Sequence, residues 1–80
     1  MTNVQDRVAR TFKNVFPNLQ EADIPRASTA SVSAWDSIAH VTLLSAIADE
    51  FGVSLEMEDF EELTSFGLIV DRLENPSQHA

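Results

Sequence analysis

The sequence predicts an all-α fold, a small four-helix bundle with a long loop between its first and second helices and a short third helix. Three observations lead to this prediction. Apolar residues recur at helical spacing in several segments, and no segment alternates at the period of two that marks a half-buried strand. The chain of 80 residues also lacks cysteine, which excludes disulfides and thiolate metal sites. A small domain without such supports usually depends on well-packed helices.

The first helix is predicted over residues 3–16, and Pro17 ends it. Its apolar positions recur at spacings of four, four and three and share one face, which consists of Val4, Val8, Phe12 and Val15. Residues 17–35 then form a long connection. Within it, the sequence of residues 20–23 is compatible with a short helical turn. Connections of this length tend to be functional or mobile in compact domains. We expect this one to be anchored to the core by Leu19, Ile24 and Val32.

The second helix is predicted to begin at Asp36 or Ser37 and to end near Gly52. The Asp36 carboxylate can accept hydrogen bonds from backbone amides of the first turn, as an N-cap residue does. Gly52 suits the left-handed backbone conformation that commonly ends a helix. The apolar ridge of this helix is predicted to consist of Ile38, Val41, Leu44, Ala48 and Phe51, widened by Leu43 and Ile47.

Two shorter helices are predicted to follow. The third covers residues 58–63, with Phe60 and Leu63 facing inward. The last covers residues 65–73 and is capped by Ser65. Its inward face is predicted to consist of Phe66, Ile69, Val70 and Leu73.

The chain is interpreted as one free-standing cytoplasmic domain over residues 1–80, with an ordered part of about 3–75. Asn75-Pro76 is expected to end the last helix, and residues 77–80 to form a frayed tail. The N-terminus has no apolar stretch behind a basic start, as a signal peptide would have. No run reaches the length that crosses a bilayer. We expect a monomer that does not associate with membranes.

The net charge of −8 is unevenly distributed along the chain. Residues 1–26 contain four basic and three acidic residues, which gives +1, whereas residues 27–80 contain ten acidic residues and one arginine, which gives −9. Such a field repels nucleic-acid phosphates and anionic lipid surfaces, so neither is an expected partner. Basic protein surfaces suit it better.

Ser37 is the candidate functional residue, because a serine that opens a helix after a long loop is unusually accessible. The first-turn amides and the helix dipole favour a phosphate ester at this position. Asp36 adds negative charge, which would help an enzyme to hold a metal-bound phosphate donor nearby. An Asp-Ser pair before an apolar helix is also an ordinary capping pair, and taken alone it favours capping.

The chain resembles acyl carrier proteins over about residues 34–73. The resemblance rests on Asp36-Ser37-Ile38 followed at matching spacing by Val41, Leu44, Ile47, Glu50-Phe51, Leu55, the acidic residues 58–62, Leu63-Thr64-Ser65 and Ile69. It implies a four-helix bundle in which a phosphopantetheinyl transferase moves a 4′-phosphopantetheine arm from coenzyme A, with Mg²⁺, onto Ser37. Asp36 would support this modification. The terminal thiol of the arm would then hold an acyl or aminoacyl group as a thioester.

The chain departs from the family pattern at three places. Ala34 stands where the family usually has glycine, and Ile38 stands where leucine is common. The outer surface of the second helix also carries small and polar residues where the family often has acids. We therefore predict that partner enzymes pack on a less acidic second helix and take their charge contacts from the third. The predicted partner-binding residues are Ile38, Ala39, Thr42, Ser45, Glu58, Glu61 and Glu62.

Two residues beside Ser37 have alternative roles. Trp35, the only tryptophan, would either shield the base of the arm or, as is more usual for this large residue, fold onto the bundle and fix the loop. His40 would be the base of a Ser37-His40-Asp36 hydrolase. Asp36 is poorly placed to orient that imidazole, however, and no Gly-rich elbow is present. We expect His40 to be a solvated helix residue near the arm.

The acidic residues 58, 59, 61 and 62 lack the alternating ligands and central glycine of a calcium-binding loop. We interpret them as a solvated acidic face and expect no metal site. Met57 and Phe60 are interpreted as core or partial core.

The leading interpretation is a carrier protein without catalytic activity, which shuttles an acyl group from a loading enzyme to a transferase or synthase of a fatty acid or polyketide pathway. An aminoacyl or peptidyl carrier that uses the same arm is the first alternative. An unmodified acidic helical interaction domain, which docks basic partners through residues 56–62, is the second. The sequence does not identify the cargo, the pathway or the loading enzyme, nor whether the cargo enters the bundle.

Overall fold

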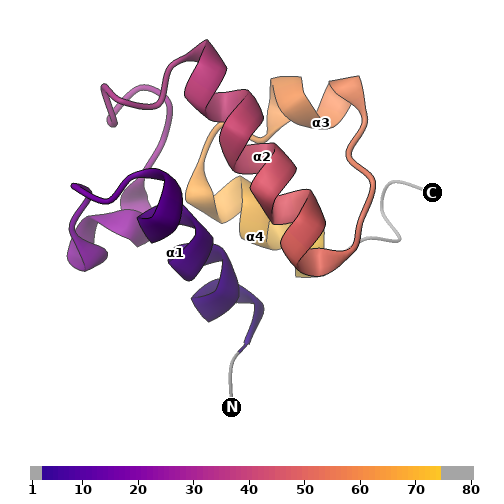
Figure 1. The fold of residues 1–80 in the computed structure, drawn as a ribbon, viewed down its shortest axis with the longest axis horizontal. Coiled ribbons are helices and arrows are strands. Elements are labelled where there is room, and N and C mark those ends of the chain that lie inside the picture. The colour runs from indigo at the N-terminus through magenta and orange to yellow at the C-terminus, as the bar shows by residue number, and fades with distance from the viewer. Residues whose placement is uncertain (1–2, 75–80) are drawn as a thin grey trace.

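The computed structural model describes residues 3–74 of the chain. Along these residues run α1 (Val4–Val15), the 3-10 helix η1 (Glu21–Arg26), α2 (Ser37–Phe51), α3 (Met57–Glu62) and α4 (Phe66–Glu74) (Figure 1). The all-α fold, the long connection before α2 and the short third helix are as predicted. Within the described part the only β-type pairing is an isolated antiparallel bridge between Ser28 and Ser65. The predicted helix end at Asn75-Pro76 and the tail lie outside the described residues.

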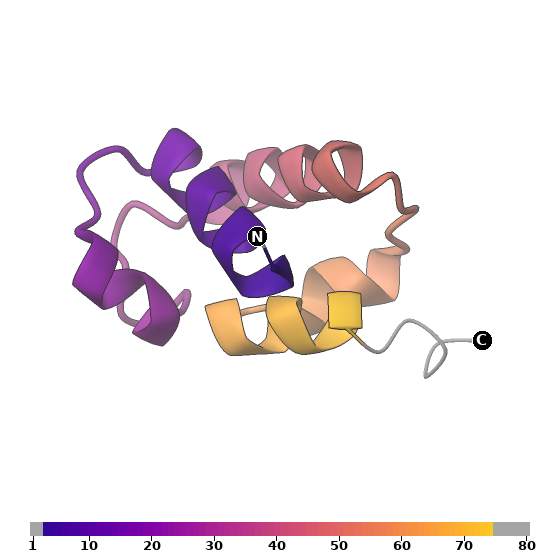
Figure 2. The same ribbon diagram turned by 90° about the horizontal axis from the view of Figure 1, so that it is seen from below.

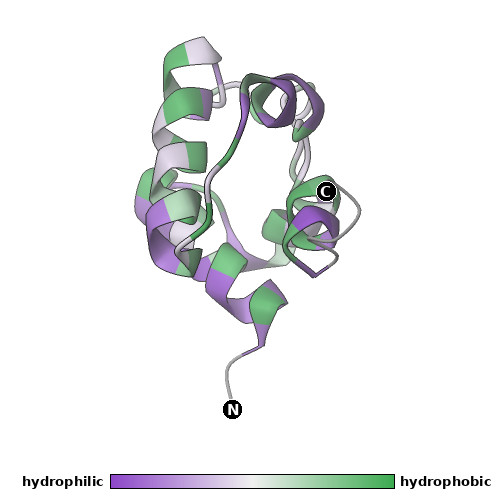
Figure 3. Cartoon of the chain, turned by 90° about the vertical axis from the view of Figure 1, so that its right-hand side faces the viewer, coloured by the Kyte–Doolittle hydropathy of each residue, from purple (hydrophilic) through white to green (hydrophobic). Residues whose placement is uncertain are grey.

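Helix α1 holds the bundle together, because it contacts both α2 and α4 (Figures 1 and 2). The η1 segment contacts α1 and α4, and α3 contacts α2. Hydrophobic positions recur among hydrophilic ones along the helices (Figure 3), which is the pattern of surface helices that each bury one face. Between residues 3 and 74 we find no helix with the length and apolar character that a membrane-spanning segment needs.

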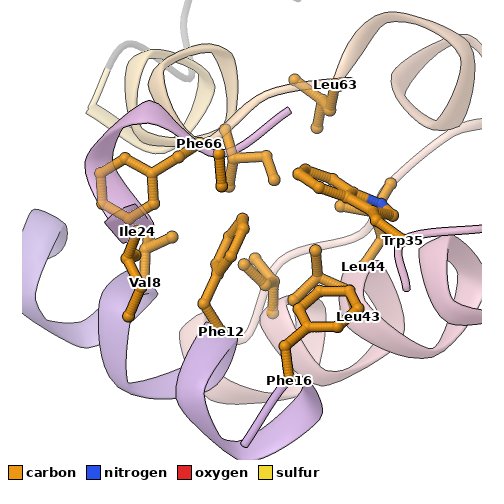
Figure 4. Packing of buried hydrophobic residues seen from close by; sticks show 12 residues of the cluster. Val8, Phe12, Phe16, Ile24, Trp35, Leu43, Leu44, Leu63 and Phe66 are labelled. Atoms are coloured by element: carbon orange, nitrogen blue, oxygen red, sulfur yellow. The ribbon is translucent and has the colours of Figure 1, made fainter. Parts of the chain in front are cut away.

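The core is built around the ring of Phe12 on α1. This ring meets Trp35 and Phe66 edge-on, with ring centroids 5.3 Å apart in both pairs (Figure 4). Aromatic pairs in this geometry contribute stability beyond their buried area. The buried hydrophobic residues are Val8, Phe12, Phe16, Ile24, Ala27, Trp35, Leu43, Leu44, Ile47, Leu63, Phe66 and Ile69.

The apolar ridge predicted for α2 is wrong in its first turns. Ile38 is 80% exposed and Val41 is 53% exposed, whereas Leu44 and Ile47 are buried. The inward-facing stripe runs through positions 40, 44, 47 and 51, which also lie three or four residues apart; Leu44 and Ile47 are buried, and His40 and Phe51 are half-buried. Positions 38 and 41 therefore fall on the outer side of the helix. Met57, expected in the core, is also 80% exposed, because it starts α3 on the outer surface.

The long connection is more ordered than the sequence predicts. The helical turn expected at residues 20–23 is a 3-10 helix that extends to Arg26 and buries Ile24. After η1, the amide of Thr29 donates to the carbonyl of Thr64 at 2.9 Å, and the amide of Phe66 donates to the carbonyl of Ala27 at 2.9 Å. These bonds fasten the connection to the turn between α3 and α4.

Both predicted ends of α2 are confirmed. The carboxylate of Asp36 accepts a hydrogen bond from the amide of Ala39 at 2.9 Å. At the other end, Gly52 has φ +64°, a left-handed conformation that a residue with a Cβ adopts only with strain. The predicted cap of the last helix is also present, since the hydroxyl of Ser65 accepts from the amide of Leu68 at 3.2 Å.

One residue of the predicted acidic face is instead inside the protein. The side chain of Asp59 is only 4% exposed and accepts from Arg72 Nε at 3.2 Å, which joins α3 to α4. Its second oxygen accepts from the amide of Glu56 at 2.8 Å. A buried carboxylate needs such compensation, because desolvating an isolated charge is expensive. Asp59 thus belongs to the interior of the bundle.

The buried ion pair predicts a difference between two arginine substitutions. Arg72→Met keeps much of the apolar volume but removes the guanidinium from a buried carboxylate, and should lower the free energy of unfolding by about 3 kcal/mol. Arg26→Met breaks an ion pair with Asp23 in which the side chains are 79% and 53% exposed, and should cost less than about 1 kcal/mol. Urea titrations followed by Trp35 fluorescence measure both, and equal losses would contradict this account.

The cap of α2 gives a second prediction. Asp36→Ala removes the acceptor for the Ala39 amide and should lower the free energy of unfolding by about 1 kcal/mol. Asp36→Asn keeps a side-chain oxygen that caps equally well, and should stay within a few tenths of the parent value. The same urea titration measures both variants. If Asn costs as much as Ala, the charge of Asp36 stabilises the helix, and its hydrogen bond does not.

Candidate functional site

Ser37 is the first residue of α2, and its side chain is exposed. It lies at the edge of an open groove of about 260 Å³, which we call the Ser37 groove and which is lined by Thr29, Trp35, Asp36, Ser37, His40, Phe60 and Thr64. The connection reaches this groove through Thr29 and the α3–α4 turn reaches it through Thr64, and these two residues are bonded to each other. The groove therefore forms where α2, α3 and the connection meet.

Trp35 forms the inner wall of the site. The residue is 3% exposed, and its ring packs against Phe12 and, with centroids 6.0 Å apart, against Phe16. Its indole N–H donates to His40 Nδ1 at 2.9 Å. The expectation that Trp35 folds onto the bundle and fixes the loop is thus confirmed, and the start of α2 is attached directly to the core.

The prediction that His40 is a solvated residue is wrong. Because Nδ1 accepts from Trp35, the ring proton of the neutral imidazole belongs on Nε2, which bonds to the carbonyl of Phe60 on α3 at 2.5 Å. The His40 ring also meets the Phe60 ring edge-on, with centroids 6.2 Å apart. No local pattern indicates these contacts, since the two partners lie 5 and 20 residues away on different segments.

The paired nitrogens of His40 bear on the hydrolase alternative. A base for Ser37 needs a ring nitrogen that can accept the serine proton, but both nitrogens of His40 are already engaged by Trp35 and Phe60. The Asp36 carboxylate is turned to the amide of Ala39. The three residues are therefore close in sequence but are not arranged as a triad.

The predicted partner surface is exposed except at one residue. Ile38, Thr42 and Ser45 on α2 are exposed, as are Glu58, Glu61 and Glu62 on α3, whereas Ala39 is half-buried against the core. Two exposed apolar residues were missed, Val41 and Met57, because their spacing favoured the core. With Ile38 they place three large apolar side chains on the outer surfaces of α2 and α3.

The charge around α2 is lower than its sequence indicates. Glu50 accepts from Arg7 Nε at 3.1 Å, and the Arg7 guanidinium also lies 4.2 Å from the centre of the Phe51 ring. Four glutamates of residues 56–62 remain exposed, namely Glu56, Glu58, Glu61 and Glu62. Within residues 3–74 no group of three or more His, Cys, Asp or Glu residues is placed to bind a metal ion.

Comparison with known proteins gives one match. The family model described as the phosphopantetheine attachment site covers residues 33–73, which include Ser37 and the whole of α2 and α3. No curated protein and no solved structure matches the chain. The match spans just over half of the sequence and agrees with the helical fold. The chain therefore belongs to the family of carrier proteins that hold a covalently attached 4′-phosphopantetheine.

Proposed function

We propose that this protein is an acyl carrier protein that bears its 4′-phosphopantetheine arm on Ser37. The observation that carries the proposal is the position of Ser37, an exposed hydroxyl at the first residue of α2, beside a groove and inside the family match. The attached arm would supply a terminal thiol that holds an acyl group as a thioester. The protein would carry that group between enzymes of a fatty acid or polyketide type of pathway.

The residues around Ser37 have distinct roles in attachment. The Ser37 oxygen forms a bond to the phosphorus of the arm, and the phosphoanhydride bond of coenzyme A breaks. Adenosine 3′,5′-bisphosphate leaves, and the serine proton passes to the transferase. Asp36 holds the first turn of α2 through the Ala39 amide, so the serine is presented on a rigid helix end. The helix dipole favours the phosphodiester charge at this position. The buried side chain of Trp35 fixes the preceding loop to the core.

An aminoacyl or peptidyl cargo is the alternative that uses the same arm. The Asp36-Ser37 pair favours an acyl cargo, in line with the resemblance to acyl carrier proteins. Loading assays with acyl and aminoacyl donors separate the two cargo classes.

The outer surfaces of α2 and α3 are proposed to bind partner enzymes. Ile38, Val41 and Met57 offer apolar area that would be buried on binding, and the glutamates of α3 offer charge to a basic rim. Ala39 contributes only in part, because it is half-buried. The transferase would contact this surface while it modifies Ser37.

The attachment residue is tested by intact mass. Incubation with coenzyme A, Mg²⁺ and a broad-specificity phosphopantetheinyl transferase should add one phosphopantetheine to the parent chain and none to Ser37→Ala. Ser54→Ala is the matched control, because Ser54 is another exposed serine, lies between α2 and α3 and is not part of the proposed partner surface; it should be modified as fully as the parent.

Two results would count against the proposal. Modification of Ser37→Ala would place the arm on another residue. No mass gain with any such transferase would favour the unmodified acidic interaction domain.

The acidic surface of α3 predicts a salt-dependent partner effect. The double reversal Glu61→Lys/Glu62→Lys should slow arm loading about tenfold at low salt, because it opposes electrostatic steering by a basic partner, and the difference should shrink at high salt. Glu21→Lys/Glu74→Lys makes the same change in net charge on η1 and α4 and should load near the parent rate. If both double variants slow equally, net charge explains the effect and the α3 surface does not.

A further inference from the structure

Three rings close the boundary between α2 and α3 beside Ser37. They belong to Trp35, His40 and Phe60, and we call them the ring row. The Trp35 and His40 ring centroids are 5.8 Å apart, and those of His40 and Phe60 are 6.2 Å apart. Hydrogen bonds run along the same line, from the indole to His40 and from His40 to the Phe60 carbonyl. The row therefore connects the loop, α2 and α3 through side chains.

The ring row lines the Ser37 groove and separates it from Phe12 in the core. Trp35 is 3% exposed, and its indole packs against Phe12 and Phe16 in the core (Figure 4). The same residue lines the Ser37 groove, so the indole lies between the groove and these two rings. Protein interiors are packed as densely as organic crystals, so an acyl chain can enter only where a side chain moves out. Moving the indole or the imidazole out would also leave a buried donor or acceptor without its hydrogen bond.

The Ser37 groove is too small to enclose the cargo in place of the interior. Its volume of about 260 Å³ lies at or below the size of ordinary small-molecule pockets. Trp35 and Phe60 make its lining mostly apolar, and Thr29 and Thr64 add hydroxyl groups. This lining suits the part of the arm next to Ser37, where a dimethyl-substituted carbon is flanked by hydroxyl and amide groups. The groove can therefore hold the part of the arm next to Ser37, with the cargo beyond it.

We propose that this carrier does not enclose its cargo: the ring row keeps the thioester and its acyl group outside the bundle, open to solvent and to partner enzymes. This inference rests on the proposed attachment at Ser37. It makes Trp35 and His40 specificity-determining residues, because they decide where the cargo is held. The cargo would then need to be short or polar enough to remain dissolved.

The accessibility of the thioester to a small nucleophile tests this proposal. The chain is loaded by the transferase from hexanoyl-coenzyme A, and intact mass first establishes that the loaded arm is present. Neutral hydroxylamine then cleaves the thioester, and mass follows the rate beside that of hexanoyl-pantetheine in solution. A rate within about threefold of the free thioester supports the proposal, since a cargo enclosed most of the time is cleaved only when it emerges. Any greater protection overturns it.

Variants of the ring row test the mechanism. Trp35→Ala replaces the indole with an apolar cavity next to Phe12, and such cavities bind small apolar molecules. Cleavage of the hexanoyl thioester should therefore be at least about threefold slower than in the parent, because a chain that enters the cavity is cleaved only when it emerges. Leu68→Ala, at a half-exposed residue of α4, is the control and should leave the rate unchanged. If Trp35→Ala is unfolded by circular dichroism, Trp35→Leu, which leaves a smaller cavity, takes its place. An unchanged rate in the folded variant would show that Trp35 does not exclude the cargo.

These experiments separate the two proposals. Absence of the loaded arm from the mass spectrum overturns attachment at Ser37, and the inference about the cargo with it. A loaded arm whose thioester is protected overturns only the inference about the cargo. A loaded arm with an exposed thioester supports both.

Discussion

The position of the Trp35 indole is the constraint on which the rest of the structure depends. Trp35 lies one residue before the cap of α2, packs edge-on against Phe12 of α1, and is bonded through His40 to α3. Three elements that are distant in sequence thus meet at one side chain. Because the indole is buried with its N–H paired, it has few alternative arrangements that would not lose a hydrogen bond. The first turn of α2, and with it Ser37, is therefore held in a fixed relation to the core.

The burial of Arg72 affects the charge of the surface. Arg72 is the only lysine or arginine among residues 27–80, and its side chain is 10% exposed because it pairs with Asp59 inside the bundle. Residues 27–74 therefore contribute exposed glutamates and aspartates to the surface but no exposed lysine or arginine, and Glu50 is paired with Arg7 of α1. Such a surface attracts basic partners over a distance set by the ionic strength. Because Arg72 is used inside the bundle, it does not offset the charge of the exposed glutamates of α3.

The sequence predicted what depends on local chemistry and missed what depends on distant contacts. The cap at Asp36, the left-handed Gly52 and the inward positions Val8 and Phe12 follow from spacing and backbone preference, and they were correct. The sequence pattern places His40 and Asp59 in solvent, because their partners are contributed by other segments. It places Ile38 and Val41 on the apolar ridge, because two overlapping stripes on α2 are both apolar and only tertiary packing selects one. At the site, the exposure of Ser37 was predictable, but the ring row behind it was not.

The bonds between the connection and the α3–α4 turn also have a consequence for the order of folding. They join residues 29 and 64, and residues 27 and 66, which are 35 and 39 positions apart along the chain. Contacts of such separation require a large loop to close first, so they form after the local helices. During synthesis α2 can form its helix as soon as it emerges from the ribosome. The contacts around its first turn are complete only after residue 66 has also emerged. Ser37 therefore acquires its native surroundings late, when nearly the whole domain has left the ribosome.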